Sequence, residues 1–123
     1  MSRRVAVTGI GLMSALGTTR ETVWNGIVEG RCGIGTVTLF DASGYRSQRA
    51  AEIPAYARDA AFSAKEWRRL SRSDQIAMIA SREALDDAGV LDGGVPRDRI
   101  GVLLGCGTAD LLIASHVATE RLR

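Results

Sequence analysis

The sequence predicts an α/β protein, because two short apolar segments end in glycines and helical patterns lie between and after them. The first segment is RVAVTGIG at residues 4–11, and the second is RIGVLLGCG at residues 99–107. Apolar runs that stop at glycines are typical of buried strands that lead into tight turns. Helices that connect such strands cover the faces of a sheet, so the chain favours a layered α/β core.

The composition is that of a globular protein and argues against two classes of partner. The 123 residues are 46% hydrophobic and 24% charged, which suits one domain with a core. The net charge of +2 is too small to predict nucleic-acid binding. No apolar run approaches the roughly 20 residues that cross a bilayer, so we expect no membrane partner. Cys32 and Cys106 form no paired pattern and we find no signal peptide, which predicts a reduced, cytoplasmic compartment.

The first helix is predicted for residues 18–30, directly after the opening segment. Thr18 and Glu21 have the spacing of a capping box, and Gly30 is a suitable terminator. One face of this helix is apolar and is expected to pack on the sheet: Val23, Trp24, Ile27 and Val28.

Residues 31–54 predict mostly irregular structure, with short strands at 36–40 and around 51–53 and a turn at 41–44. The capping-box spacing then occurs twice more and predicts a short helix followed by a longer one that Gly89 ends. The two capping pairs are Ser63 with Glu66 and Ser71 with Asp74. A last helix is predicted from residue 109 to residue 123 without a terminator, so we expect the chain to be the front part of a longer protein.

The glycines of the opening segment allow two interpretations. GIGLMS, beginning at Gly9, is close to a dinucleotide-binding fingerprint, but Ser14 stands where the third glycine or alanine belongs. The acidic residue that should follow a second strand would be Glu29, which falls inside the predicted first helix. We therefore favour the simpler explanation, that the glycines allow close packing of strand and helix.

Cys106 lies between two glycines at the end of the second predicted strand, a position at which nucleophiles are often presented. Its base would have to be His116, the only histidine, about two helical turns or roughly 10 Å farther along the next helix. A direct pair is disfavoured by that distance, so we interpret Cys106 as a small packed residue. Cys32, Cys106 and His116 also lack the spacing of a metal site.

Lys65, Arg68 and Arg69 form a cationic group in the short predicted helix. Their i, i+3 and i+4 spacing places the three charges on one helix face, while Trp67 lies on another side and can anchor the helix. Arg72 would extend the positive charge. The pattern is typical either of a solvated helix face or of a surface that docks an acidic partner.

Four segments in order give the chain a resemblance to a known family. They are VAVTGIG from Val5 with Ser14 and Gly17, GI at 33–34 with FDAS at 40–43, SDQ at 73–75 with EALDDAG at 83–89, and RIGV at 99–102 with GCG at 105–107. Together they resemble the amino-terminal part of a β-ketoacyl-[acyl-carrier-protein] synthase of the elongating type. The sequence departs from the family pattern at Ala15, where proline is frequent, and at Cys106, where serine is frequent.

The resemblance implies a thiolase-like layered fold, of which residues 1–123 form the N-terminal portion. It implies a condensing enzyme that performs a decarboxylative Claisen condensation of an acyl thioester with malonyl-acyl-carrier protein, in fatty-acid or polyketide synthesis. The family's nucleophilic cysteine and two histidines fall beyond residue 123, so we expect no catalytic residue, metal or cofactor in the chain. Lys65, Arg68 and Arg69 match the family's docking site for acyl carrier protein, and Thr108 matches a position near the acyl pocket.

The resemblance also implies a dimer, either of identical subunits or with a related synthase subunit. Two alternatives to the enzyme stay open at this point. The first is a non-catalytic partner subunit of the chain-length-factor type, which keeps the fold and the docking surface. The second is a Rossmann-like nucleotide-binding domain.

Overall fold

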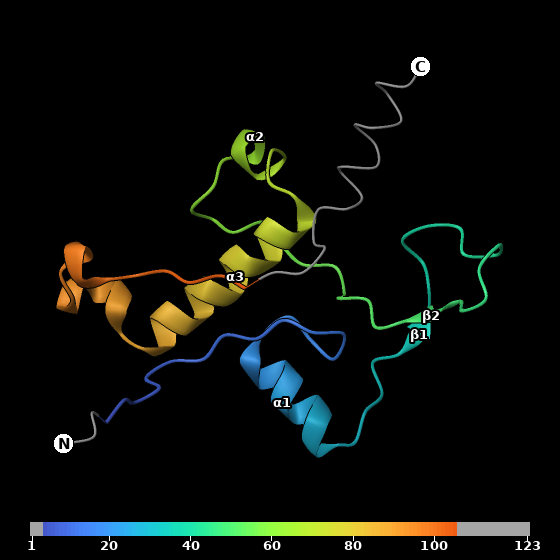
Figure 1. Ribbon diagram of the computed structural model, residues 1–123, viewed down its shortest axis with the longest axis horizontal. Helices are drawn as coiled ribbons and strands as arrows, with labels where there is room; N and C mark the ends of the chain where they lie inside the picture. Colours follow the sequence, from blue (N-terminus) through green and yellow to red (C-terminus); the bar gives the residue numbers. More distant parts are fainter. Residues whose placement is uncertain (1–3, 106–123) are drawn as a thin grey trace.

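The computed structural model describes residues 4–105, which form a small mixed unit of helices and short strands (Figure 1). Its elements in chain order are α1 (Arg20–Val28), β1 (Gly35–Thr36), β2 (Arg49–Ala50), α2 (Ala64–Trp67), α3 (Arg72–Asp87), a π-helical turn (Val90–Gly94) and a 3₁₀ turn (Arg97–Arg99). Within this part of the chain, no helix combines the length and the apolar character that crossing a membrane requires.

Helix α3 is the longest element, and its local signals act as predicted. The Ser71 hydroxyl accepts a hydrogen bond from Asp74 N, while the Asp74 carboxylate accepts one from Ser71 N. At the other end Gly89 has φ +65°, the left-handed conformation that glycine adopts without a steric penalty. Both ends of α3 therefore depend on residues adjacent in sequence, and the prediction is confirmed.

Helix α1 forms, but its predicted cap is wrong by one residue. The N-cap is Thr19, whose hydroxyl accepts from Thr22 N, and the Thr22 hydroxyl accepts the reciprocal bond from Thr19 N. Threonine at the third helical position thus does what Glu21 was expected to do. The predicted apolar face is also wrong in part, because Val23 is buried while Trp24 is 62% exposed.

The two predicted glycine-ended strands are absent from the described residues. Residues 4–13 and 100–105 are assigned to no strand, and Val5 and Leu103 are almost fully exposed. A strand needs a second backbone beside it to receive its hydrogen bonds. The neighbour of the first segment is instead helix α3, which supplies side-chain carboxylates rather than a backbone ladder.

The strands β1 and β2 pair antiparallel, with Gly35 opposite Ala50 and Thr36 opposite Arg49. They are shorter than predicted and begin earlier. The reason is Glu52, whose carboxylate accepts hydrogen bonds from Thr38 N, Leu39 N and the Thr38 hydroxyl. These bonds lower the pKa of Glu52, with the Thr38 hydroxyl the largest cause. A side chain therefore occupies the amides that a longer strand would have paired.

Few side chains are shielded from solvent in this part of the chain. Among the described residues, the buried hydrophobic side chains are Val23 and Ala42. Large apolar side chains with more than half of their area exposed occur along the opening segment, α1 and residues 102–104. The described residues therefore form a framework of local elements rather than a closed core.

Candidate functional site

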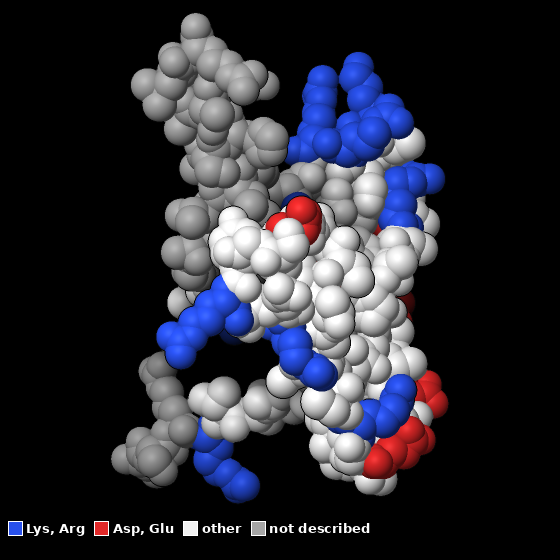
Figure 2. All heavy atoms as spheres, turned by 90° about the vertical axis from the view of Figure 1, so that its right-hand side faces the viewer, with Lys and Arg blue, Asp and Glu red and all other residues white. Residues whose placement is uncertain are grey.

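The group Lys65, Arg68 and Arg69, called the basic turn from here on, lies on α2 and the turn that follows it. All three side chains are exposed. The ion pairs among residues 4–105 involve Arg20, Arg31 and Arg82, and none involves the basic turn. Figure 2 shows lysine and arginine side chains gathered at the upper end of one face, the end at which α2 lies in Figure 1. The three charges are thus accessible to an acidic partner.

The capping box of α2 explains why these charges stay unpaired. The Ser63 hydroxyl accepts from Glu66 N, and the Glu66 carboxylate accepts from Ser63 N at 2.9 Å and from the Ser63 hydroxyl at 2.7 Å. The hydroxyl bond is the main reason that the pKa of Glu66 is lowered. Glu66 is the acidic residue of this helix, and its carboxylate is bonded to Ser63 at the N-terminal end.

Trp67 anchors α2 on the side away from solvent, as predicted. It is half-buried, and its ring packs against Phe62 with centroids 5.7 Å apart. Arg72 does more than extend the positive charge. Its guanidinium lies 5.3 Å from the centroid of the Tyr56 ring, and its Nη2 donates to Ile53 O at 2.9 Å. Arg72 therefore joins α3 to the segment before α2.

The glycines of the opening segment pack directly on α3. A Cβ added to Gly9 would lie 2.1 Å from Ala84 O, and one added to Gly11 would lie 1.8 Å from Ala80 O. Both positions therefore exclude any side chain. The close packing of these glycines on a helix is confirmed, but the helix is α3 and not the one that follows in sequence, and the segment that carries them is not a strand. The glycine faces that a dinucleotide would approach are occupied by helix backbone.

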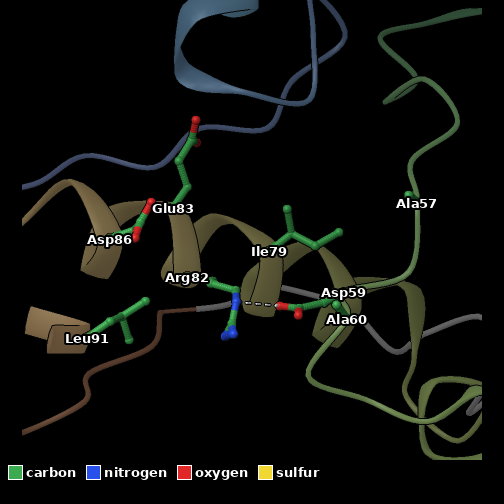
Figure 3. Close-up of a pocket in the computed structure, with 8 residues that line it drawn as sticks. All are labelled: Ala57, Asp59, Ala60, Ile79, Arg82, Glu83, Asp86 and Leu91. Atoms are coloured by element: carbon green, nitrogen blue, oxygen red, sulfur yellow. Dashed lines mark ion pairs between the residues drawn. The ribbon is translucent and has the colours of Figure 1, made fainter.

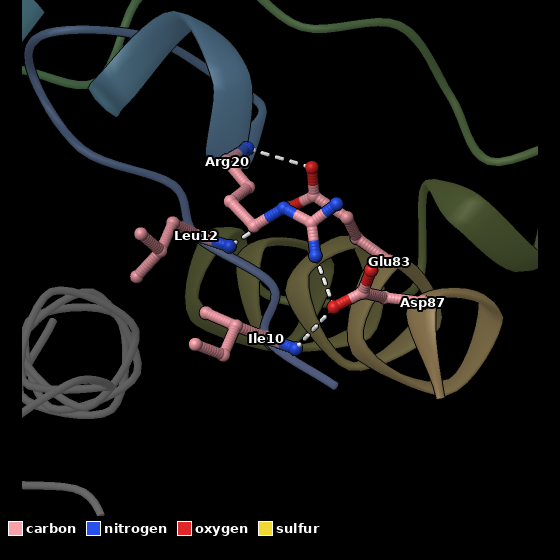
Figure 4. A network of polar contacts seen from close by, with 5 residues as sticks. All are labelled: Ile10, Leu12, Arg20, Glu83 and Asp87. Atoms are coloured by element: carbon pink, nitrogen blue, oxygen red, sulfur yellow. Dashed lines mark hydrogen bonds and ion pairs between the residues drawn. The ribbon is translucent and has the colours of Figure 1, made fainter. Parts of the chain in front are cut away.

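Two carboxylates of α3 hold the same segment in an arrangement that we call the clasp (Figure 4). Glu83 accepts from Leu12 N at 2.8 Å through Oε2 and from Arg20 N at 2.6 Å through Oε1. Asp87 Oδ2 accepts from Ile10 N at 3.0 Å and pairs with the Arg20 guanidinium. The pKa of Asp87 is lowered, chiefly by the hydrogen bond from Arg20 and then by that from Ile10 N.

Sequence reasoning missed the clasp, although a signal was present. Glu83 and Asp87 are four residues apart, so they lie on one face of α3. Glu83 also lies within the helix's mostly apolar stripe, which includes Ile79 and Ala80. An acidic residue in such a stripe indicates a specific partner, because an unpaired carboxylate facing a packed neighbour is costly.

Two hollows border α3 and the opening segment. The first measures about 520 Å³ and is lined by Ala57, Asp59, Ala60, Ile79, Arg82, Glu83, Asp86 and Leu91 (Figure 3). Within it the Asp59 side chain is only 6% exposed and lies 3.5 Å from Arg82 Nε. The second measures about 720 Å³ and is lined by Ile10, Leu12, Arg20, Glu21, Trp24 and Ile27.

Neither hollow contains a nucleophile beside a base. The cysteine among residues 4–105 is Cys32, which is exposed, and this part of the chain has no histidine. Cys106, Thr108 and His116 lie outside the described residues. The described part of the chain therefore offers a binding surface, the basic turn, rather than a reaction centre.

Comparison with known proteins identifies the relatives of the chain. Residues 2–122 match the family described as "Beta-ketoacyl synthase, N-terminal domain". The chain is 36% identical over 117 residues to 3-oxoacyl-[acyl-carrier-protein] synthase 2 of Synechocystis sp., covering 95% of this chain and 28% of that protein. It is 38% identical over 109 residues to the granaticin polyketide putative beta-ketoacyl synthase 1 of Streptomyces violaceoruber, covering 89% of this chain and 26% of the relative.

A solved structure agrees with these relatives. The structure described as "The ishigamide ketosynthase/chain length factor" superposes with a TM-score of 0.66 at 28% identity, over 96% of this chain and 30% of that one. The chain thus spans less than a third of the length of each of these relatives.

Proposed function

Because this chain belongs to the β-ketoacyl synthase family, we propose that it forms the N-terminal part of a condensing enzyme. In that enzyme an acyl group is joined to the malonyl unit of malonyl-acyl-carrier protein, with loss of carbon dioxide and formation of a carbon–carbon bond. The nucleophilic cysteine and the two assisting histidines belong to the part that follows residue 123. We refer to the whole protein as the complete synthase, and we propose that it is a cytoplasmic dimer with a layered thiolase fold.

The exposed apolar segments support the layered fold. Val5 is 93% exposed and Val7 is 82% exposed, while Leu103 is 98% exposed. Each lies in an extended segment that the apolar pattern predicts as a strand. Burying such side chains in a sheet stabilises a protein by roughly 1.5–3 kcal/mol each, so a longer chain gains by covering them.

The basic turn carries the proposal for this part of the chain. It presents three unpaired charges on an anchored turn, and we assign it to docking of the acidic acyl carrier protein. Charges at the rim of an interface chiefly raise the association rate and set orientation, and their effect is screened by salt. Over the roughly 8 Å screening length at physiological ionic strength, neighbouring charges on one turn act together.

The test replaces Lys65, Arg68 and Arg69 by alanine in the complete synthase. At roughly 0.5 kcal/mol for each exposed charge, the loss is about 1.5 kcal/mol, or about a tenfold rise in KM for acyl-carrier-protein substrates. The salt dependence of kcat/KM should become flatter. Turnover of a small acyl thioester without the carrier should stay near that of the wild type, because the basic turn has no part in the chemistry.

A matched control removes three positive charges elsewhere, by replacing Arg4, Arg46 and Arg99 with alanine. These arginines are exposed, and no ion pair among the described residues involves them. The control should leave KM for the carrier substrate within about twofold. Equal losses in both triple variants would show that net charge alone matters, and no loss in the first would remove the docking role.

A second candidate function is a non-catalytic partner subunit of the chain-length-factor type. The observation that favours it is the similarity to a structure that contains both a ketosynthase and a chain length factor. Such a subunit would keep the clasp and the basic turn. The residue at the nucleophile position beyond residue 123 separates the two, since cysteine there indicates the enzyme and any other residue indicates the partner subunit.

A further inference from the structure

The basic turn depends on contacts from outside its own helix. Helix α2 is only four residues long, Ala64–Trp67. Nucleation of a helix is costly, and isolated helices shorter than about 12 residues are not stable in water. The capping box closes the N-terminal end of α2. Whatever closes the other end decides how Arg68 and Arg69 are held.

Gln75, on the first turns of α3, closes that other end. Its Nε2 donates hydrogen bonds to Trp67 O at 3.0 Å and to Leu70 O at 3.3 Å. Trp67 O also accepts from Leu70 N at 3.2 Å, so Gln75 adds a second bond to that carbonyl, and its bond to Leu70 O ties the turn after α2 to α3. Arg68 and Arg69 lie between the two carbonyls in sequence, and the backbone that carries them is held on both sides.

The orientation of the Gln75 side chain is itself fixed by a third bond. Its Oε1 accepts a hydrogen bond from the Tyr56 hydroxyl at 3.1 Å. The Tyr56 ring in turn lies beneath the Arg72 guanidinium, which adds a cation–π contact. An amide suits this position because it offers two donors on one atom and an acceptor on the other.

We propose that Gln75 is a positioning residue for carrier docking, which fixes the orientation of the basic turn through Trp67 O and Leu70 O. Tyr56 supports it by holding its amide oxygen. This inference rests on the proposed function of the basic turn. Without the bonds of Gln75 the three charges remain, but they sample more orientations, so each productive encounter with the acidic carrier costs more conformational entropy.

The test uses Gln75→Met in the complete synthase, which preserves size and net charge while removing all three hydrogen bonds. The amides of Arg68, Arg69 and Leu70 should exchange with solvent about tenfold faster, while those in the middle of α3 keep their wild-type rates. KM for acyl-carrier-protein substrates should rise about fivefold. The salt dependence should stay at the wild-type slope, because no charge is lost, and kcat for a small thioester should not change.

Two further variants make the outcome specific. Gln48→Met is the matched control, because Gln48 lies in the exposed segment between β1 and β2 and its side chain donates to Ser43 O. This variant should leave the amide exchange of residues 68–70 and the KM for acyl-carrier-protein substrates unchanged. Tyr56→Phe keeps the ring under Arg72 and removes only the hydroxyl. It should therefore raise the amide exchange rates of residues 68–70 and the KM for acyl-carrier-protein substrates, each by about twofold. Tyr56→Phe also tests the positioning role if Gln75→Met folds poorly.

The outcomes separate this inference from the docking proposal. The positioning role is overturned if the amide exchange of residues 68–70 is unchanged in Gln75→Met. It is also overturned if exchange becomes faster while KM for the carrier stays the same. Both conclusions hold even if removal of the three charges raises KM. An equal loss of kcat with both substrates indicates a general structural role and also overturns it. If removal of the three charges leaves KM unaltered, docking fails and the positioning role fails with it.

Discussion

Placing a methyl group at Gly11 should separate the opening segment from α3. A Cβ there lies 1.8 Å from Ala80 O, whereas ordinary contact begins at 3.4 Å, so the segment in Gly11→Ala must retreat by about 1.6 Å. Such a movement lengthens the bond from Leu12 N to Glu83 from 2.8 Å to about 4.4 Å, beyond hydrogen-bonding range. The bond from Ile10 N to Asp87, now 3.0 Å, is lost in the same way.

The expected loss follows from those two bonds. Hydrogen bonds to charged groups contribute roughly 1.5–3 kcal/mol each, and partial exposure of the clasp favours the lower end. We therefore expect Gly11→Ala to lower the free energy of unfolding of the complete synthase by about 3 kcal/mol. Urea titration monitored by tryptophan fluorescence measures this value, provided that the slope with denaturant is unchanged.

Gly35→Ala is the matched control. A Cβ at Gly35 meets no atom within 4 Å, and its backbone has ordinary φ. The free energy of unfolding in this variant should stay within about 0.5 kcal/mol of the wild type. If Gly11→Ala is as stable as Gly35→Ala, the close approach of the opening segment to α3 does not exist in solution and the clasp argument is refuted.

Two other predictions concern the clasp and the exposed apolar surface. The pKa of Asp87 is lowered below 3.8, so the stability it contributes is fully present above pH 3.8 and is lost as pH falls through the lower value of the folded protein. Asp87→Asn should therefore weaken the acid dependence of unfolding below about pH 4, measured by urea titration at a series of pH values; an unchanged profile would contradict the role of Asp87. Large apolar side chains such as Val5, Val7 and Leu103 are more than 80% exposed, so residues 1–123 alone should aggregate or bind hydrophobic dyes without a cooperative transition. A sharp, reversible thermal transition of the monomer would argue against it.

Helix ends were predictable from sequence wherever their partners are adjacent. The pairs Ser63 with Glu66 and Ser71 with Asp74 form the capping boxes that their spacing indicates, and Gly89 ends α3. Each of these features joins residues no more than four positions apart. The α1 cap shows the limit of such reasoning, because Thr18 and Thr19 are both capable caps and the choice depends on the chain entering the helix.

In the candidate site, too, features set by neighbouring residues were predictable and contacts between distant residues were not. The i, i+3 and i+4 spacing predicted that the three charges of the basic turn lie together, although α2 ends at Trp67 and Arg69 lies in the turn that follows it. The bonds that hold this turn were not predictable, because Gln75 is eight residues from Trp67 and nineteen from Tyr56. No local pattern distinguishes a glutamine that closes another helix from one that faces solvent.

What the sequence by itself determined was the identity of the local elements and the close-packing role of the opening glycines. Only the tertiary structure decided that Gly9 and Gly11 meet α3, more than sixty residues away, and that Glu83 and Asp87 hold the intervening backbone. The tertiary structure likewise decided whether the extended segments 4–13 and 100–105 form strands. A strand's hydrogen bonds are made to whichever chain lies beside it, so its formation depends on a neighbour that local sequence does not name.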